Sequence, residues 1–106
     1  MVTFDQFKQM DLRIGKIVTC EDHPNADKLY LLSVDIGGGT RKLVAGIKGH
    51  YSKDELINKK VVVIANLETA TIRGVQSEGM VLATKDKEKL ALLIPEKDVE
   101  IGSPIS

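Results

Sequence analysis

The sequence has little of what several classes of protein require. Its 106 residues include one cysteine, three prolines, two tyrosines, two phenylalanines and no tryptophan. The single cysteine, Cys20, excludes an internal disulfide bond and any zinc site built from several cysteines, and we expect it to be a small buried side chain. No apolar run approaches the ~18 residues of a membrane span, and residues 1–10 lack the apolar centre of a signal peptide. We therefore expect a cytoplasmic protein with no membrane partner.

An excess of charge of one sign is also absent. Fifteen Lys and Arg balance fifteen Asp and Glu, so the formal net charge is zero. Nucleic-acid binding would then need positive groups gathered on one face. Aromatic rings are too few to stack a run of bases, because Phe4 and Phe7 fall in a predicted helix and only Tyr30 and Tyr51 remain. Generic single-strand binding is disfavoured.

Catalytic and metal-binding motifs are missing as well. His23, His50 and Cys20 are not spaced as paired metal ligands, and neither HxxxH nor CxxC occurs. There is no Gly-x-Ser-x-Gly motif, and glycines 37–39 lack the Lys-Ser/Thr and the helix of a P-loop. We predict no catalytic residue, no metal and no cofactor, and therefore a binding module rather than an enzyme.

The apolar patterning predicts an all-β domain. A capping box at Thr3 and Gln6 predicts a short helix that ends near Met10 and covers one edge of the fold, and a second capping box at Ser52 predicts one or two further helical turns. Five or so strands are expected within 12–18, 28–36, 41–45, 60–67 (buried on both faces), 80–84 and 90–94. This order, with a helix after the third strand, predicts an OB-fold: a five-stranded barrel over 11–94 and a C-terminal extension over 95–106 in one domain, 1–106.

The stretch from Asn66 to Met80 joins two apolar strands by a long excursion, and such excursions are often functional. Arg73 could fork onto a phosphate, while Asn66 and Ser77 could bond a sugar or a base edge, and Met80 could offer a soft apolar contact. Each also has a structural alternative: Asn66 could bond the loop backbone, Ser77 could cap a turn, and Met80 could belong to the core. Lys28, at the start of the second strand, could simply be solvated.

Four blocks stand in order along the sequence: DLRIGKI (11–17), HPNADKL (23–29), VIANL (63–67) and RGVQSEGM (73–80). They resemble the tRNA-binding domain of methionyl-tRNA synthetases, which occurs at their C-terminus, as a separate β subunit, and as stand-alone dimeric tRNA-binding proteins. The resemblance covers nearly the whole chain, and four blocks in order are far more specific than any one of them.

The resemblance implies an OB barrel whose C-terminal extension forms a homodimer and which binds the outer corner of tRNA without catalysis. It implies a methionyl-tRNA synthetase catalytic chain as partner, in cis or in trans. The implied tRNA contacts are Lys28, Asn66, Arg73, Ser77 and Met80, with Arg41 and Lys42 as electrostatic neighbours. The alternative is a dimeric peptide-binding chaperone of the same superfamily, in which Met80 and Tyr30 would line an apolar cleft.

The chain departs from the family pattern at one place. After Asn66 and Leu67 the family commonly has Lys-Pro and a further Lys before the arginine, whereas this chain has Glu68-Thr69-Ala70-Thr71-Ile72. Two positive charges are therefore missing. Each phosphate contact adds to affinity through release of counterions, so we expect weaker binding with a flatter salt dependence than the family pattern would give.

Overall fold

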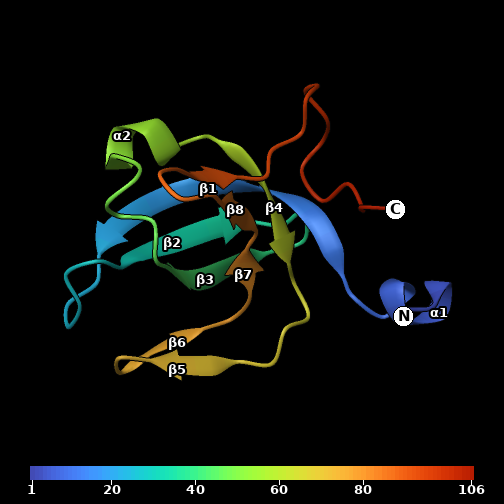
Figure 1. The fold of residues 1–106 in the computed structure, drawn as a ribbon, viewed down its shortest axis with the longest axis horizontal. Coiled ribbons are helices and arrows are strands. Elements are labelled where there is room, and N and C mark those ends of the chain that lie inside the picture. The colour runs from blue at the N-terminus through green and yellow to red at the C-terminus, as the bar shows by residue number, and fades with distance from the viewer.

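A computed structural model describes residues 1–106, and its main element is a five-stranded antiparallel sheet that curves into a nearly closed barrel (Figure 1). The order of the strands in the sheet is β3-β2-β1-β4-β7. These strands are β1 (Leu12–Asp22), β2 (Tyr30–Asp35), β3 (Thr40–Ala45), β4 (Lys60–Ile64) and β7 (Met80–Val81). The prediction of an all-β barrel of the OB type with short helices is confirmed.

Two small hairpins stand beside the main sheet. One joins β5 (Ala70–Ile72) to β6 (Val75–Ser77), and the other joins β8 (Ala83–Lys85) to β9 (Leu90–Leu92). The expected single strand over 80–84 is thus divided between β7 and β8. In Figure 1 the β5–β6 hairpin projects away from the barrel, on the side opposite the second helix.

The long strand β1 is shared between the two halves of the barrel. Residues 12–16 pair with β4, residues 16–22 pair with β2, and the register shifts between Ile17 and Thr19, which is a bulge. Gly15 lies where the strand crosses the core, and a Cβ there would be 2.6 Å from Cγ1 of Val34. A glycine is needed at this close approach, as its place in the apolar pattern suggests.

The core lies inside the barrel and is built from alternate residues of each strand. Leu32 and Val34 of β2, and Val61 and Val63 of β4, are almost fully buried. The prediction that the 60–67 strand is buried on both faces is wrong, because Val62 and Ile64 alternate with the buried residues and are half-exposed. A β-branched run looks the same in either case, and here the outer face of β4 is only partly covered.

Both predicted helices are present. In α1 (Phe4–Lys8) and α2 (Lys53–Leu56) the capping boxes form as expected, at Thr3 with Gln6 and at Ser52 with Glu55. Leu56 is fully buried in the core, whereas α1 buries no residue and stands beside the barrel instead of covering an edge (Figure 1). Neither helix has the length and apolar character needed to cross a membrane.

The barrel closes between β3 and residues 77–79. The Glu78 amide donates to the carbonyl of Lys42 over 2.8 Å, the Lys42 amide donates to the Glu78 carboxylate, and the Val44 amide donates to the Ser77 hydroxyl over 2.9 Å. Gly79 has φ +148°, and a Cβ there would be 2.8 Å from the carbonyl oxygen of Ile64. The barrel seam, the contact between β3 and residues 77–79, is therefore closed partly by side-chain hydrogen bonds and not by a regular backbone ladder.

The end of the chain adds to the free edge of β1. Because β2 pairs with β1 only from Lys16 onward, the first residues of β1 have an open edge. Ile14 donates to the carbonyl of Ser103, and Gly102 and Ile105 donate to the carbonyls of Ile14 and Leu12. The C-terminal residues therefore lie along the barrel next to α1.

Candidate nucleic-acid interface

The excursion between β4 and β7 is an ordered hairpin and not an irregular loop. Ile72 pairs with Val75, so only Arg73 and Gly74 form the turn, and their φ values are +52° and +87°. Positive φ at both positions is the requirement of a type I′ turn, whose usual sequence is Asn-Gly. Arginine is an uncommon choice there, because a left-handed conformation costs an L-residue about 1–2 kcal/mol. The turn places the exposed Arg73 at the hairpin tip.

The hairpin tip is held by the turn that follows β1. Nε2 of His23 lies 3.0 Å from the carbonyl oxygen of Ile72, and the Asn25 amide group donates to the carbonyl of Arg73, also over 3.0 Å. The Arg73 guanidinium in turn donates to the carbonyl of Asn25. His23 is buried, with 5% exposure. The only signal in the sequence for its role is its place in the HPNADKL block.

The hydrogen bonds of His23 define which ring nitrogen carries the proton. The Asn25 backbone N–H can only donate, so Nδ1, 3.0 Å away, accepts. The Ile72 carbonyl can only accept, so Nε2 donates. This neutral tautomer uses both nitrogens, one within its own turn and one across to the hairpin.

Positive side chains lie at both ends of the hairpin. At the tip, Asn25 bonds the Arg73 carbonyl, and the exposed Lys28 follows Asn25 by three residues, at most about 11 Å of chain. At the base, β3 carries Arg41, half-buried with its guanidinium on the carbonyl of Ala65, and the exposed Lys42. Three residue steps, about 10 Å, separate Gly74 in the turn from Ser77 at the base. The predicted cations thus lie in two parts of the chain, Arg73 and Lys28 at and after the clamped turns and Arg41 and Lys42 on β3.

Ser77 is engaged inside the barrel. It is buried, with 3% exposure, and its hydroxyl accepts from the Val44 amide and donates to the carbonyl of Gly79 over 3.0 Å. These contacts favour the structural alternative for Ser77, and its direct contact with RNA stays a prediction. Its hydroxyl joins the base of the hairpin to β3.

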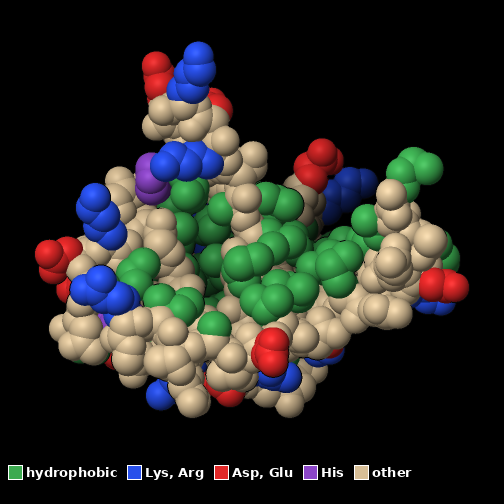
Figure 2. All heavy atoms as spheres, turned by 60° about the horizontal axis from the view of Figure 1, so that its bottom comes forward, with side chains coloured by type: hydrophobic (Ala, Val, Ile, Leu, Met, Phe, Trp, Pro, Cys, Tyr) green, Lys and Arg blue, Asp and Glu red, His purple; other side chains and the backbone are tan.

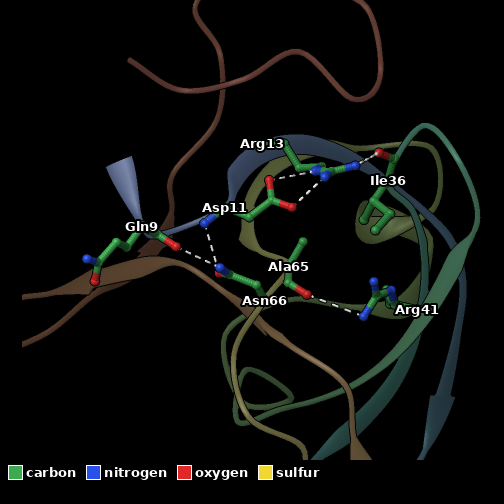
Figure 3. Close-up of polar contacts among 7 residues, drawn as sticks. All are labelled: Gln9, Asp11, Arg13, Ile36, Arg41, Ala65 and Asn66. Atoms are coloured by element: carbon green, nitrogen blue, oxygen red, sulfur yellow. Dashed lines mark hydrogen bonds and ion pairs between the residues drawn. The ribbon is translucent and has the colours of Figure 1, made fainter. Parts of the chain in front are cut away.

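Asn66 is exposed, but its side chain is also engaged. Oδ1 accepts from the Asp11 amide over 2.8 Å and Nδ2 donates to the carbonyl of Gln9 over 2.7 Å, so this residue anchors the segment between α1 and β1 (Figure 3). In the same cluster Arg13 bonds both carboxylate oxygens of Asp11 and holds the pKa of that carboxyl below its usual value. The structural alternative for Asn66 is the one that the contacts support.

Met80 belongs to an outward-facing apolar row. Ile64 pairs with Met80 and Val63 with Val81; since Val63 and Val81 are buried, the side chains of Ile64 and Met80 face outward. Met80 is 44% exposed. We define the apolar row as Val62, Ile64, Met80 and Leu82. Figure 2 shows hydrophobic side chains gathered in the middle of the face that it presents, with most Lys and Arg toward its margins.

A second apolar feature is a groove between α1 and the end of the chain. Its volume is about 480 Å³, and Phe4, Phe7, Met10, Pro104 and Ile105 are among the residues that line it. Phe4 is 71% exposed, which is unusual for a large aromatic side chain. No group of three or more His, Cys, Asp or Glu side chains is arranged to hold a metal ion.

A nearly closed barrel with a cation-bearing hairpin at its side defines a small barrel of the nucleic-acid-binding class. Residues 12–104 match the family model described as "Putative tRNA binding domain", and the chain belongs to this family. It is 56% identical over 104 residues to a methionine–tRNA ligase of Pyrococcus furiosus; the match covers 98% of the chain but only 14% of that relative.

Two solved structures are similar over the full chain. The first is a MetRS related protein from Pyrococcus horikoshii, with a TM-score of 0.91 and 27% identity, which is matched over 98% of its length. The second is the CsaA chaperone protein from Picrophilus torridus, with a TM-score of 0.91 and 34% identity over all of both chains. The likeness therefore extends to proteins with two different described roles.

Proposed function

We propose that this chain binds tRNA without catalysing a reaction, and that as the C-terminal domain or β subunit of a methionyl-tRNA synthetase, or as a stand-alone protein, it strengthens tRNA capture. The observation that carries the proposal is the clamped hairpin, which presents Arg73 at its tip in a member of the tRNA-binding domain family. Shape-selective RNA binding through phosphates and 2′-hydroxyls needs cations more than rings, and the chain has few rings.

The proposed contacts divide by role. Arg73 and Lys28 bind phosphates at the hairpin tip, and Arg41 and Lys42 attract the backbone at the base. Met80, at the start of β7 just after the hairpin, offers an apolar contact. Asn66 and Ser77 support the surface through hydrogen bonds within the fold. Tethering to a catalytic chain would then make the second contact with tRNA intramolecular, which raises residence without new chemistry.

We further propose a homodimer. The groove between α1 and residues 104–105 exposes Phe4 and Met10, and the apolar row lies on the outer face of β4 and β7. Large exposed apolar areas on a small domain commonly mark protein interfaces. A second copy that covers the groove would also bring the C-terminal extension into the contact, as the family resemblance implies.

The proposal is tested by titrating the chain with total tRNA at two salt concentrations, with its mass in solution determined alongside. If the chain contacts two or more phosphates, raising the salt from roughly 50 to 200 mM should weaken tRNA binding by about tenfold or more. The expected mass is that of two chains. Absence of binding at low salt would overturn the tRNA proposal, and a monomeric mass would overturn the dimer.

The second candidate is a peptide-binding chaperone, which the apolar row and the full-length similarity to the CsaA protein favour. Of the two residues expected to line an apolar cleft, Met80 is exposed, but Tyr30 is buried in the core with its hydroxyl on the carbonyl of Tyr51. Salt separates the two functions. Binding of an unfolded peptide to the apolar row should persist or strengthen at high salt, whereas phosphate binding falls steeply.

Restoring a cation at the departure from the family pattern should strengthen tRNA binding. Glu68 is exposed and precedes β5 by two residues. We expect Glu68→Lys to raise affinity for tRNA several-fold at low salt and to steepen the salt slope by about one, because repulsion is removed and one phosphate contact is gained. The matched control is Glu88→Lys in the β8–β9 turn, well separated from the hairpin in Figure 1. Equal gains in both variants would show a mere net-charge effect.

A further inference from the structure

We propose that His23 and Asn25 are positioning residues of the tRNA site: their side chains hold the hairpin tip, and so fix the place of Arg73. This inference rests on the proposed tRNA function. The two side chains take consecutive carbonyls of the hairpin, His23 that of Ile72 and Asn25 that of Arg73, each over 3.0 Å. No other side chain donates to the backbone of the turn.

The hairpin needs this support. Strands β5 and β6 have three residues each and form a sheet of their own that pairs with no other strand. A two-stranded hairpin alone is at best marginally stable in water. At its base it is held by Ser77 on the Val44 amide, but Gly74 in the turn is about 10 Å away along the strand. Without the clamp, the end that carries Arg73 would be free to move.

The position of Arg73 affects tRNA affinity through the conformational entropy that is lost on binding. A guanidinium that is already in place loses less conformational freedom when it meets a phosphate than one on a mobile loop. Arg73 is placed twice, through its carbonyl by Asn25 and through its guanidinium on the carbonyl of Asn25. A loosened tip would still carry the same charge, so affinity would fall while the number of phosphate contacts in the bound state stayed the same.

The chemistry of His23 gives a matched pair of variants. Glutamine can place an amide donor near the position of Nε2, and so keep the bond to the Ile72 carbonyl. It loses the acceptor for the backbone N–H of Asn25. Asparagine can place an acceptor near the position of Nδ1, and so keep the local turn while losing the bond to the hairpin. If the clamp is the function of His23, His23→Gln should resemble the parent and His23→Asn should not. Asn25→Ala removes the second half of the clamp.

The first readout uses no tRNA. Trypsin can cut after Arg73 when the tip opens, and after Arg13 in β1 only when the barrel unfolds, since Ile14 is buried. The ratio of cleavage at 73–74 to cleavage at 13–14, followed by mass spectrometry, therefore reports the tip alone. We expect this ratio to rise about tenfold in His23→Asn and Asn25→Ala and to stay near the parent value in His23→Gln. Equal ratios in all four proteins would overturn the clamp.

The second readout is tRNA affinity as a function of salt. We expect His23→Asn and Asn25→Ala to lose about tenfold in affinity with an unchanged salt slope, and neither to weaken binding further in a chain that already lacks Arg73. An additive loss in that background would overturn the link to Arg73. If the parent chain does not bind tRNA, the proposed function fails and with it the role in tRNA binding, whereas the cleavage ratio still decides whether the two side chains hold the tip.

Discussion

Replacing Arg73 by asparagine should weaken tRNA binding by about ten- to a hundredfold while leaving the fold as stable as that of the parent. Hydrogen bonds between an arginine and a charged oxygen contribute roughly 1.5–3 kcal/mol, and each 1.4 kcal/mol is a factor of ten in affinity. Loss of one phosphate contact should also reduce the salt slope by about one. Arg73 is the exposed cation at the tip of the hairpin, so no neighbour on the turn can take its place.

Asparagine is the right substitute because the turn prefers it. Arg73 has φ +52° and precedes Gly74 at +87°, and Asn-Gly is the favoured sequence of such a turn. The bond from Asn25 is made to the backbone carbonyl of residue 73 and does not need the arginine side chain. We therefore expect the free energy of unfolding to be unchanged or slightly increased. Alanine would confound the two effects, since it lacks the tolerance of asparagine for the left-handed conformation.

The measurement is a tRNA titration at several salt concentrations, paired with urea unfolding of the same samples. Arg73→Lys keeps the positive charge but loses the two-pronged guanidinium donor, so its tRNA affinity should lie between those of the parent and Arg73→Asn. The control for loss of any single cation is Lys87→Asn in the β8–β9 turn, which should change affinity little. A parent-like affinity and salt slope in Arg73→Asn would remove Arg73 from the site.

Local signals in the sequence predicted most of the fold. The capping boxes at Thr3 and Ser52 give two helix starts, because each depends on residues close together in the chain. The division of residues 66–80 into a hairpin was not predicted. Its turn uses arginine where asparagine is usual, so the pattern of a type I′ turn is hidden from sequence reasoning.

The candidate site was less predictable, because its polar side chains have two possible uses. A serine or an asparagine between two strands has the same pattern whether it faces RNA or bonds the chain's own backbone. In the structure both side chains bond the chain's own backbone. Ser77 bonds Val44, 33 residues away in the sequence, and Asn66 bonds Asp11, 55 residues away. Only tertiary structure reveals such partners.

Contacts across the sequence also explain why the four blocks occur together. The HPNADKL block meets the RGVQSEGM block through Asn25 and Arg73, 48 residues apart. The DLRIGKI block meets the VIANL block through Asp11 and Asn66. Each of these blocks thus supplies part of the frame that carries the hairpin. The blocks identify the site mainly through its scaffold.

Replacing Ser77 by alanine should destabilise the barrel by about 2 kcal/mol or more. The change removes the acceptor of the Val44 amide and the donor to the carbonyl of Gly79, in a place where Ser77 and Val44 are both buried. Leaving a buried backbone group without a partner costs about 1–3 kcal/mol. The natural control is Ser33→Ala on the half-exposed outer face of β2, which should change the free energy of unfolding by less than about 0.5 kcal/mol.

This prediction separates a scaffold residue from a ligand contact. If Ser77 supports the base of the hairpin, urea unfolding should detect the loss first, and tRNA affinity should fall only as far as the hairpin is loosened, with an unchanged salt slope. If Ser77 instead touches RNA, Ser77→Ala would be nearly as stable as the parent yet bind tRNA weakly. The buried hydroxyl and its two bonds favour the first result, because a donor that already serves the Gly79 carbonyl in the barrel seam has no free hydrogen for a phosphate or sugar.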